Sequence, residues 1–177
     1  MREIVKNSNG ESFSIGIVMS EFNLHVGEAL LKACHHELLN LGVKDDHIIL
    51  AKVPGALESP LALKKMAQSK KFDALIALGA VIRGETFHFE VVANHSAKSI
   101  MDVQLEFSMP IVNAILTTEN DEQAMERTSV KGAEAAQVAG DVLGPDIDGV
   151  DAVGQHVGEL DRVGTVGRGE GRTQDSV

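Results

Sequence analysis

The sequence is short of aromatic residues, since its 177 residues include six phenylalanines and neither tryptophan nor tyrosine. Basic residues are outnumbered as well, 16 against 26 acidic residues, which gives a formal net charge of −10. Proteins that recognise nucleic acids commonly present a basic face and aromatic platforms on which bases stack. The chain lacks both features, so we expect no nucleic-acid partner.

Cysteine and long apolar runs are also scarce. The single cysteine, Cys34, excludes an internal disulfide framework and a cysteine-based zinc site, and it is typical of a reducing compartment. No apolar run approaches the roughly 18 residues that a membrane span needs, and no signal peptide opens the sequence. An apolar content of 44% is nevertheless ordinary for a globular protein. These features predict an acidic, soluble, cytoplasmic protein with no membrane partner.

Strand-like and helix-like segments alternate along the chain. Clusters of apolar residues between turn residues predict strands at residues 13–19, 47–53, 74–78 and 111–116. Apolar residues at helical spacing predict helices at residues 26–41, 61–67 and 88–107, a short one ending near 127, and a last one from 131. This alternation favours a parallel sheet covered on both faces, an α/β three-layer αβα sandwich.

The composition changes beyond residue 143. Residues 144–177 hold eight glycines and seven acidic residues against three arginines, and no lysine, phenylalanine, methionine or asparagine. We therefore predict a domain over residues 1–143 and a Gly/Asp-rich, flexible or atypical tail over residues 144–177. One hypothesis is that an appended or out-of-frame sequence replaces the normal end of the last helix.

The strongest local signal is the segment at residues 79–88, which reads Gly-Ala-Val-Ile-Arg-Gly-Glu-Thr-Phe-His. It follows a buried strand and opens a helix, so its free backbone N–H groups can hold an anion. It nearly matches the nucleotide-binding P-loop, but Glu85 stands in place of the obligatory lysine, which disfavours nucleotide hydrolysis. Two interpretations stay open here: a monophosphate site with Thr86 as hydroxyl donor, and a plain strand-to-helix turn.

Four other side chains near strand ends or on helices could act on a ligand, although each also has a structural explanation. His88 could transfer protons near neutral pH or lie on the surface. Phe22 could stack on a planar ring or anchor its loop. Glu58 could bind hydroxyl groups, or it could lie at a helix N-terminus, where the helix dipole stabilises its charge. Arg127 could pair with a phosphate, or it could lie at the end of a helix, where a positive charge suits the dipole. No set of His, Asp and Glu has metal-ligand spacing, so we predict no metal site.

Together, four segments resemble the 6,7-dimethyl-8-ribityllumazine synthase family in order and spacing. They are residues 20–23 (Ser-Glu-Phe-Asn), 53–60 (Val-Pro-Gly-Ala-Leu-Glu-Ser-Pro), 79–89, and 116–124 (Leu-Thr-Thr-Glu-Asn-Asp-Glu-Gln-Ala). The resemblance implies a flavodoxin-like, four-stranded parallel sheet. It also implies homo-pentamers, pairs of pentamers or icosahedral shells, with active sites between neighbouring subunits.

The resemblance implies a transferase of riboflavin biosynthesis that needs no metal or organic cofactor. Its small-molecule substrates are 5-amino-6-ribitylaminouracil and 3,4-dihydroxy-2-butanone 4-phosphate, and its products are 6,7-dimethyl-8-ribityllumazine, phosphate and water. His88 would be the general acid/base. Phosphate would be bound by Gly84, Glu85, Thr86 and, from the adjacent subunit, Arg127. The pyrimidine and its ribityl chain would contact Phe22, Asn23, Gly55, Ala56, Glu58, Ala80, Val81, Ile82, Asn113 and Lys131.

Several positions depart from the family pattern. Glu21 replaces a basic residue, Ser59 replaces an apolar one, and Asn113 occupies a position that is often phenylalanine. The chain between Arg127 and Lys131 is about four residues shorter than in many relatives. Gly140, Gly144 and Pro145 also weaken the end of the last helix, and this change bears on the number of subunits more than on the chemistry. Two alternative functions remain: a related binding or shell-forming protein without turnover, and a flavodoxin-like or P-loop nucleotide binder.

Overall fold

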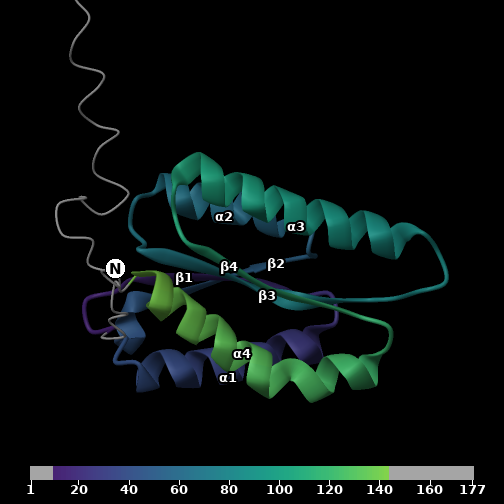
Figure 1. Cartoon of the computed structure of the whole chain (residues 1–177), viewed down its shortest axis with the longest axis horizontal. Coiled ribbons are helices and arrows are strands. Elements are labelled where there is room, and N and C mark those ends of the chain that lie inside the picture. The colour runs from purple at the N-terminus through teal and green to yellow at the C-terminus, as the bar shows by residue number, and fades with distance from the viewer. Residues whose placement is uncertain (1–9, 144–177) are drawn as a thin grey trace, which may run out of the picture.

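The computed structural model describes residues 10–143, which form a parallel sheet with two helices on each face (Figure 1). The sheet has the order β2-β1-β3-β4, and its strands are β1 (Ile15–Ser20), β2 (Ile48–Val53), β3 (Ala74–Ile82) and β4 (Ile111–Thr118). The helices are α1 (Leu24–Asn40), α2 (Ser59–Gln68), α3 (His88–Phe107) and α4 (Asp121–Leu143), with a 3-10 turn η1 (Asp45–His47). The predicted α/β three-layer sandwich with a flavodoxin-like, four-stranded parallel sheet is confirmed.

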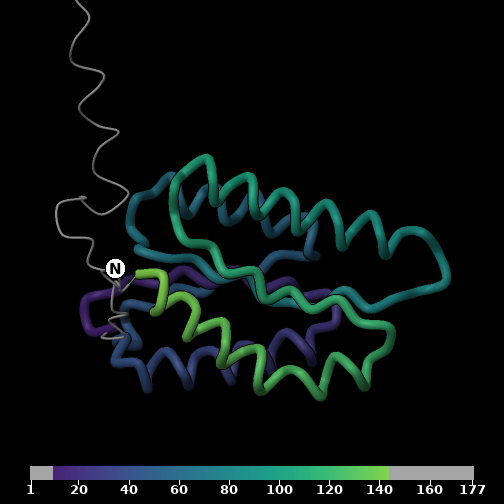
Figure 2. Tube along the Cα trace, viewed as in Figure 1, coloured from purple at the N-terminus to yellow at the C-terminus, as the bar shows by residue number. Residues whose placement is uncertain are grey.

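The side chains of the central strands serve two separate cores. Along β1, Ile15, Ile17 and Met19 pack with the buried residues of α1 and α4, whereas Val18 packs with those of α2 and α3. Successive residues of a strand point to opposite faces, so a strand buried on both sides is apolar throughout. Figure 2 shows the sheet between its two helical layers. β3 is buried on both faces in the same way, with Ile76 in one core and Leu75 in the other. The predicted central strand at residues 74–78 is confirmed, and β3 continues it to Ile82.

The last helix of the described residues differs from the prediction. Two helices were expected after residue 120, but α4 is one helix from Asp121 to Leu143, so Arg127 does not close a helix. The expected start is correct, because Asn120 Oδ1 accepts from the Gln123 N–H at 2.9 Å and Gln123 Oε1 accepts from the Glu119 N–H at 3.1 Å. Close packing accounts for the continuity: a Cβ on Gly132 would lie 2.5 Å from the Leu30 carbonyl oxygen of α1. Contact between the two helices offsets the poor helix propensity of glycine.

Parts of the prediction lie outside the described residues, namely residues 1–9 of the domain and the whole tail at 144–177. Within residues 10–143, no helix is long and apolar enough to cross a membrane.

The strand order creates a switch point between β1 and β3. The chain leaves β1 into α1 on one face of the sheet and leaves β3 into α3 on the other face (Figure 1). In open α/β sheets, ligands bind in the crevice where neighbouring connections diverge in this way. The carboxyl ends of β1 and β3 are therefore the expected place of a ligand site.

Candidate active site

The connection from β1 to α1 is held by hydrogen bonds. The N–H groups of Glu21 and Phe22 donate to the carbonyls of Val53 and Pro54 at 2.8 and 3.0 Å. Asn23 adopts a left-handed conformation with φ 59°, and its side-chain amide donates to the Ala80 carbonyl at 3.1 Å. These bonds fix the backbone around Phe22, whose side chain remains 72% exposed. A planar ligand could cover this ring without any rearrangement of the loop.

Close contact brings the ends of β1 and β3 together. A Cβ on Gly79 would lie 2.0 Å from Ser20 Oγ, so only glycine leaves room for the serine side chain here. Ser20 Oγ is buried and has no hydrogen-bond partner among residues 10–143. Beyond this contact, Ala80 and Val81 are buried and Ile82 is half-buried, so β3 presents its backbone more than its side chains to a ligand.

The connection from β2 to α2 carries a carboxylate. The Glu58 N–H donates to the Gly55 carbonyl at 3.2 Å, and a Cβ on Gly55 would lie 3.0 Å from Glu58 Oε2. The carboxylate thus lies over Gly55 and is exposed, while Ala56 beside it is buried. This arrangement offers hydroxyl groups an acceptor next to open backbone.

The segment between β3 and α3, residues 83–87, is a turn that leads into a helix N-terminus. Gly84, Glu85 and Thr86 are exposed, and so is His88, the first residue of α3. The His88 N–H approaches Thr86 Oγ1 at 3.4 Å. A strand followed by a turn and the open end of a helix is the geometry that binds anions. It also places the His88 imidazole at the helix N-terminus where an anion would bind.

Arg83 joins this turn to its surroundings, and the sequence analysis did not single it out. Its guanidinium pairs with Glu90 of α3 and, through Nε at 2.7 Å, with Glu119. It also lies over the ring of Phe89, 4.1 Å from the ring centre. The hydrogen bond between Arg83 and Glu90 raises the pKa of Arg83 and lowers the pKa of Glu90. The local sequence signal, an arginine seven residues before a glutamate, is too common to identify such a residue.

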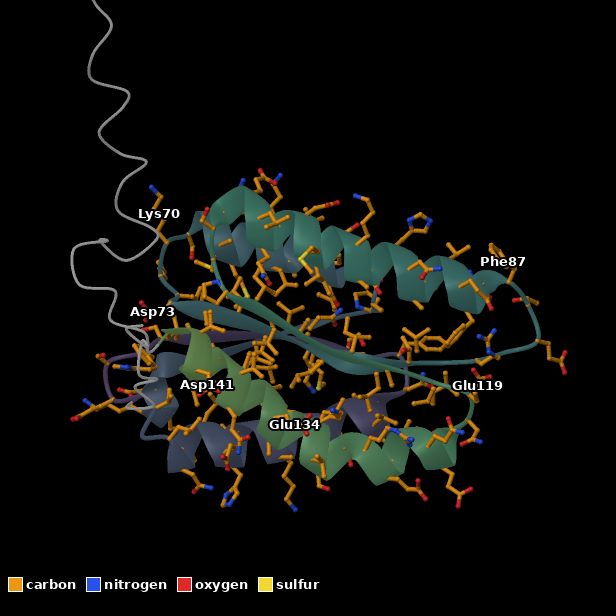
Figure 3. All side chains as sticks on the ribbon, in the orientation of Figure 1. Lys70, Asp73, Phe87, Glu119, Glu134 and Asp141 are labelled. Atoms are coloured by element: carbon orange, nitrogen blue, oxygen red, sulfur yellow. The ribbon has the colours of Figure 1, made fainter. Side chains whose placement is uncertain are left out.

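Three predicted site residues make their hydrogen bonds within their own elements. Arg127 donates to the Gln123 carbonyl at 2.6 Å, and Lys131 pairs with Glu134. The Asn113 side chain accepts from the Ile115 N–H at 3.1 Å. In the sheet, Asn113 of β4 lies beside Ala77 of β3, three residues before Ala80. In the described part of the chain, no hydrogen bond or ion pair joins these three side chains to residues 79–88. Figure 3 shows Phe87 and Glu119 at one end of the molecule and Glu134 farther along α4.

Other reactive groups and hollows lie elsewhere. Cys34 is buried in the core, and burial raises its pKa to about 12, so it is not a nucleophile. Within residues 10–143, no group of three or more His, Cys, Asp or Glu residues could hold a metal ion. A groove of about 430 Å³ lies between α1 and β2, where Leu31 and Ile48 line it, and it contains no predicted site residue.

The described geometry defines a class of protein: a flavodoxin-like α/β protein whose β1/β3 switch point is the candidate ligand site. The connections at this edge carry an exposed aromatic ring, Phe22, an exposed carboxylate, Glu58, and a turn that opens a helix N-terminus.

Comparison with known proteins gives the particular family. Residues 12–144 match the family model of 6,7-dimethyl-8-ribityllumazine synthase. The chain is 62% identical over 143 residues to the 6,7-dimethyl-8-ribityllumazine synthase of Methylobacillus flagellatus, which covers 81% of this chain and 96% of the relative. Relatives of the same name from Nitrosospira multiformis and Nitrosomonas europaea are each 58% identical over 137 residues, covering 77% of this chain and 86% and 84% of their own lengths. The chain belongs to the 6,7-dimethyl-8-ribityllumazine synthase family.

Proposed function

We propose that the chain condenses 5-amino-6-ribitylaminouracil with 3,4-dihydroxy-2-butanone 4-phosphate to give 6,7-dimethyl-8-ribityllumazine, phosphate and water. The observation that carries this proposal is the 62% identity over 143 residues to an enzyme of that name. The open site at the switch point supports it, because an aromatic ring lies near one strand end and an anion-binding turn follows the neighbouring strand.

The connections after β1 and β2 would bind the pyrimidine substrate. Phe22 would stack on its ring, because the side chain is exposed while its backbone is fixed. The backbone at Asn23 and Ala56 and the Glu58 carboxylate would hold the ribityl hydroxyls. Further contacts to the ring and ribityl chain would come from Gly55, Ala80, Val81 and Ile82.

The turn after β3 would bind the phosphate of the second substrate and bring the ketone to the aryl amine. Gly84, Glu85 and Thr86 would surround the phosphate through backbone N–H groups and the Thr86 hydroxyl. His88 would relay protons during imine formation and phosphate elimination. Much of the rate would come from holding two reactants together, since intramolecular alignment alone lowers the barrier by about 7–11 kcal/mol in favourable cases.

The site would be completed by a neighbouring subunit in a cytoplasmic homo-pentamer or a multiple of one. Arg127 would bind phosphate there, with Lys131 and Asn113 near the pyrimidine. This sharing is supported by the position of the three residues on α4 and β4, where their hydrogen bonds are local. It is also supported by Phe22 and Phe87, which are 72% and 74% exposed in a single chain.

The enzyme proper would occupy residues 1–143, with residues 144–177 as a separate tail. The match to the family model, which ends at residue 144, supports this boundary. A chain cut after residue 143 should retain the activity of the full chain in the same assay. Loss of activity on truncation would assign the tail a part in catalysis or assembly.

The direct test mixes the purified full chain with both substrates and follows lumazine fluorescence and phosphate release together. We expect the two products in equal amounts. Substrate binding without turnover would instead favour the non-catalytic alternative. Light scattering during size-exclusion chromatography should then give a mass that is a multiple of five 18.9 kDa chains.

A further inference from the structure

We propose that Arg83 is a positioning residue that holds the phosphate-binding turn against the β4–α4 connection and thereby sets the affinity for the phosphate-bearing substrate. The identity of that substrate rests on the proposed function. The position of Arg83 does not, because it follows from contacts that involve no ligand.

The turn has few contacts of its own. A Cβ on Gly84 would meet no atom within 4 Å, and Glu85, Thr86 and Phe87 are exposed. The hydrogen bond found within the turn is the long one from the His88 N–H to Thr86 Oγ1, at 3.4 Å. A glycine-containing segment with so little packing does not define one position by itself.

Arg83 connects the turn to three other points. Its N–H donates to the Thr118 carbonyl at the end of β4, at 2.9 Å. Its guanidinium pairs with Glu119, one residue beyond β4, with Nε at 2.7 Å from Oε2. The same group pairs with Glu90 and lies over Phe89, both in the first turn of α3. The residue thus links the last residues of two neighbouring strands to the helix that opens the anion site.

The charge of Arg83 is already matched within the chain. Two carboxylates, Glu90 and Glu119, contact one guanidinium, so this group of three carries one net negative charge. Such a group does not attract a phosphate. Arg83 therefore differs from Arg127, whose hydrogen bond is to a backbone carbonyl and whose nearest carboxylate, Glu126, is 3.9 Å away. An effect of Arg83 on phosphate affinity must come mainly from where it holds the turn.

Position and charge can be separated because they give opposite results for Glu119→Gln. This change removes a negative charge near the phosphate site, so electrostatics alone lowers the KM for the butanone phosphate. It also weakens the link between the turn and β4, so the proposed role raises that KM. We expect a rise of about threefold for Glu119→Gln and about tenfold for Arg83→Gln, since small misplacements of binding groups have effects of this order or larger.

The experiment measures KM for each substrate and kcat in the wild type, Arg83→Gln, Glu119→Gln and a matched control, Lys64→Gln. Lys64 also pairs with a glutamate, Glu106 at 2.9 Å, and lies 5.9 Å from an aromatic ring, that of Phe107, but it joins α2 to the far end of α3. The KM for the phosphate substrate should rise in both site variants and stay unchanged in the control. The KM for the pyrimidine should change by less than about twofold, because a shift of the phosphate-binding turn does not weaken the binding of the other substrate.

Three results would overturn the proposal: a lower phosphate KM in Glu119→Gln, equal rises in both KM values, or the same rise in Lys64→Gln. If Arg83→Gln does not fold, Glu119→Gln alone tests the proposal. The Glu119 side chain is 61% exposed, so its replacement removes no core contact. Calorimetric titration with inorganic phosphate provides a readout that does not need turnover. A wild type without lumazine formation contradicts the proposed function, while weaker phosphate binding in the two site variants would still support the role of Arg83.

Discussion

The two connections that leave the switch point are fixed in different ways. The connection after β1 is held by backbone hydrogen bonds to Val53 and Pro54 and by the side chain of Asn23. The turn after β3 is held by one backbone hydrogen bond, from the Arg83 N–H to the Thr118 carbonyl, and by the ion pairs of the Arg83 side chain. Backbone bonds are little affected by pH and salt, whereas exposed ion pairs are sensitive to both. The side of the site proposed to bind the ring should therefore be little affected by pH and salt, and the side proposed to bind phosphate should be sensitive to both.

The largest effect should come from removing the cation proposed to neutralise the phosphate. We expect Arg127→Ala to lower kcat/KM for the butanone phosphate by about 10³-fold, because charge stabilisation by one well-placed group has this order. Steady-state kinetics with each substrate varied would measure it. If pyrimidine binding suffered equally, the division of the site into two independent halves would be wrong.

His88→Ala should have the next largest effect. General acid/base catalysis by a positioned side chain contributes about 10²-fold, so activity should fall by that order and remain measurable. The remainder would come from holding the two reactants together. A stopped assay with long incubation can detect such residual lumazine formation, and a complete absence of product would contradict a mechanism dominated by proximity.

Gly79→Ala tests the packing beneath both connections. The new methyl group would lie 2.0 Å from Ser20 Oγ, and overpacking of this kind destabilises a protein by about 1–3 kcal/mol. Ser20→Ala in the same chain should restore part of that loss, since Ser20 Cβ stays 3.2 Å away. Ser20→Ala alone should cost nothing, because the buried hydroxyl has no partner. Denaturant unfolding of the four proteins gives the coupling, and additive effects would exclude the contact.

Phe22→Ala should affect only the ring-binding side. Loss of a stacking partner is expected to raise the KM for the pyrimidine by about tenfold and to leave the KM for the phosphate substrate nearly unchanged. Phe87→Ala is a suitable control, because Phe87 is equally exposed but no role in ring binding is proposed for it. Equal effects of the two variants would remove the special role of Phe22.

The smallest effect concerns pH. The hydrogen bond from Arg83 lowers the pKa of Glu90, so Glu90 contributes stability that is fully present above its unfolded pKa and is lost as pH falls through the lowered folded pKa. The difference in free energy of unfolding between the wild type and Glu90→Gln should thus be constant near neutrality and shrink below about pH 4.3, the ordinary glutamate pKa. Urea unfolding between neutral and acidic pH measures it. A difference independent of pH would show that the pair contributes no electrostatic stability.

Sequence patterns predicted most of the fold because its elements carry clear periodicities. The helix α3 has the predicted bounds, and the four strands lie where apolar runs placed them. The single helix α4 was not predicted, because its continuity at Gly132 depends on contact with α1 and not on local propensity. Local patterns also located the turn between β3 and α3, since a strand, a glycine and a helix start are adjacent in sequence, but whether it binds an anion remains a prediction.

The role of Arg83 could not be predicted in the same way. Its partners Glu90 and Glu119 come from two different elements, and only the folded sheet brings them to one guanidinium. The residues alone left Arg127 open between a phosphate partner and a helix end, and the roles of Lys131 and Asn113 came from family resemblance alone. They remain predictions, because their partners in a single chain are local.

The exposed ring of Phe22 has a thermodynamic consequence for ligand binding. A planar ligand that covers a ring already 72% exposed, on a backbone that is already fixed, removes apolar surface from water without ordering the loop. Such binding carries a negative heat-capacity change, so its enthalpy becomes more favourable as the temperature rises. Calorimetry of the pyrimidine over a range of temperatures would therefore register the covering of a single aromatic side chain.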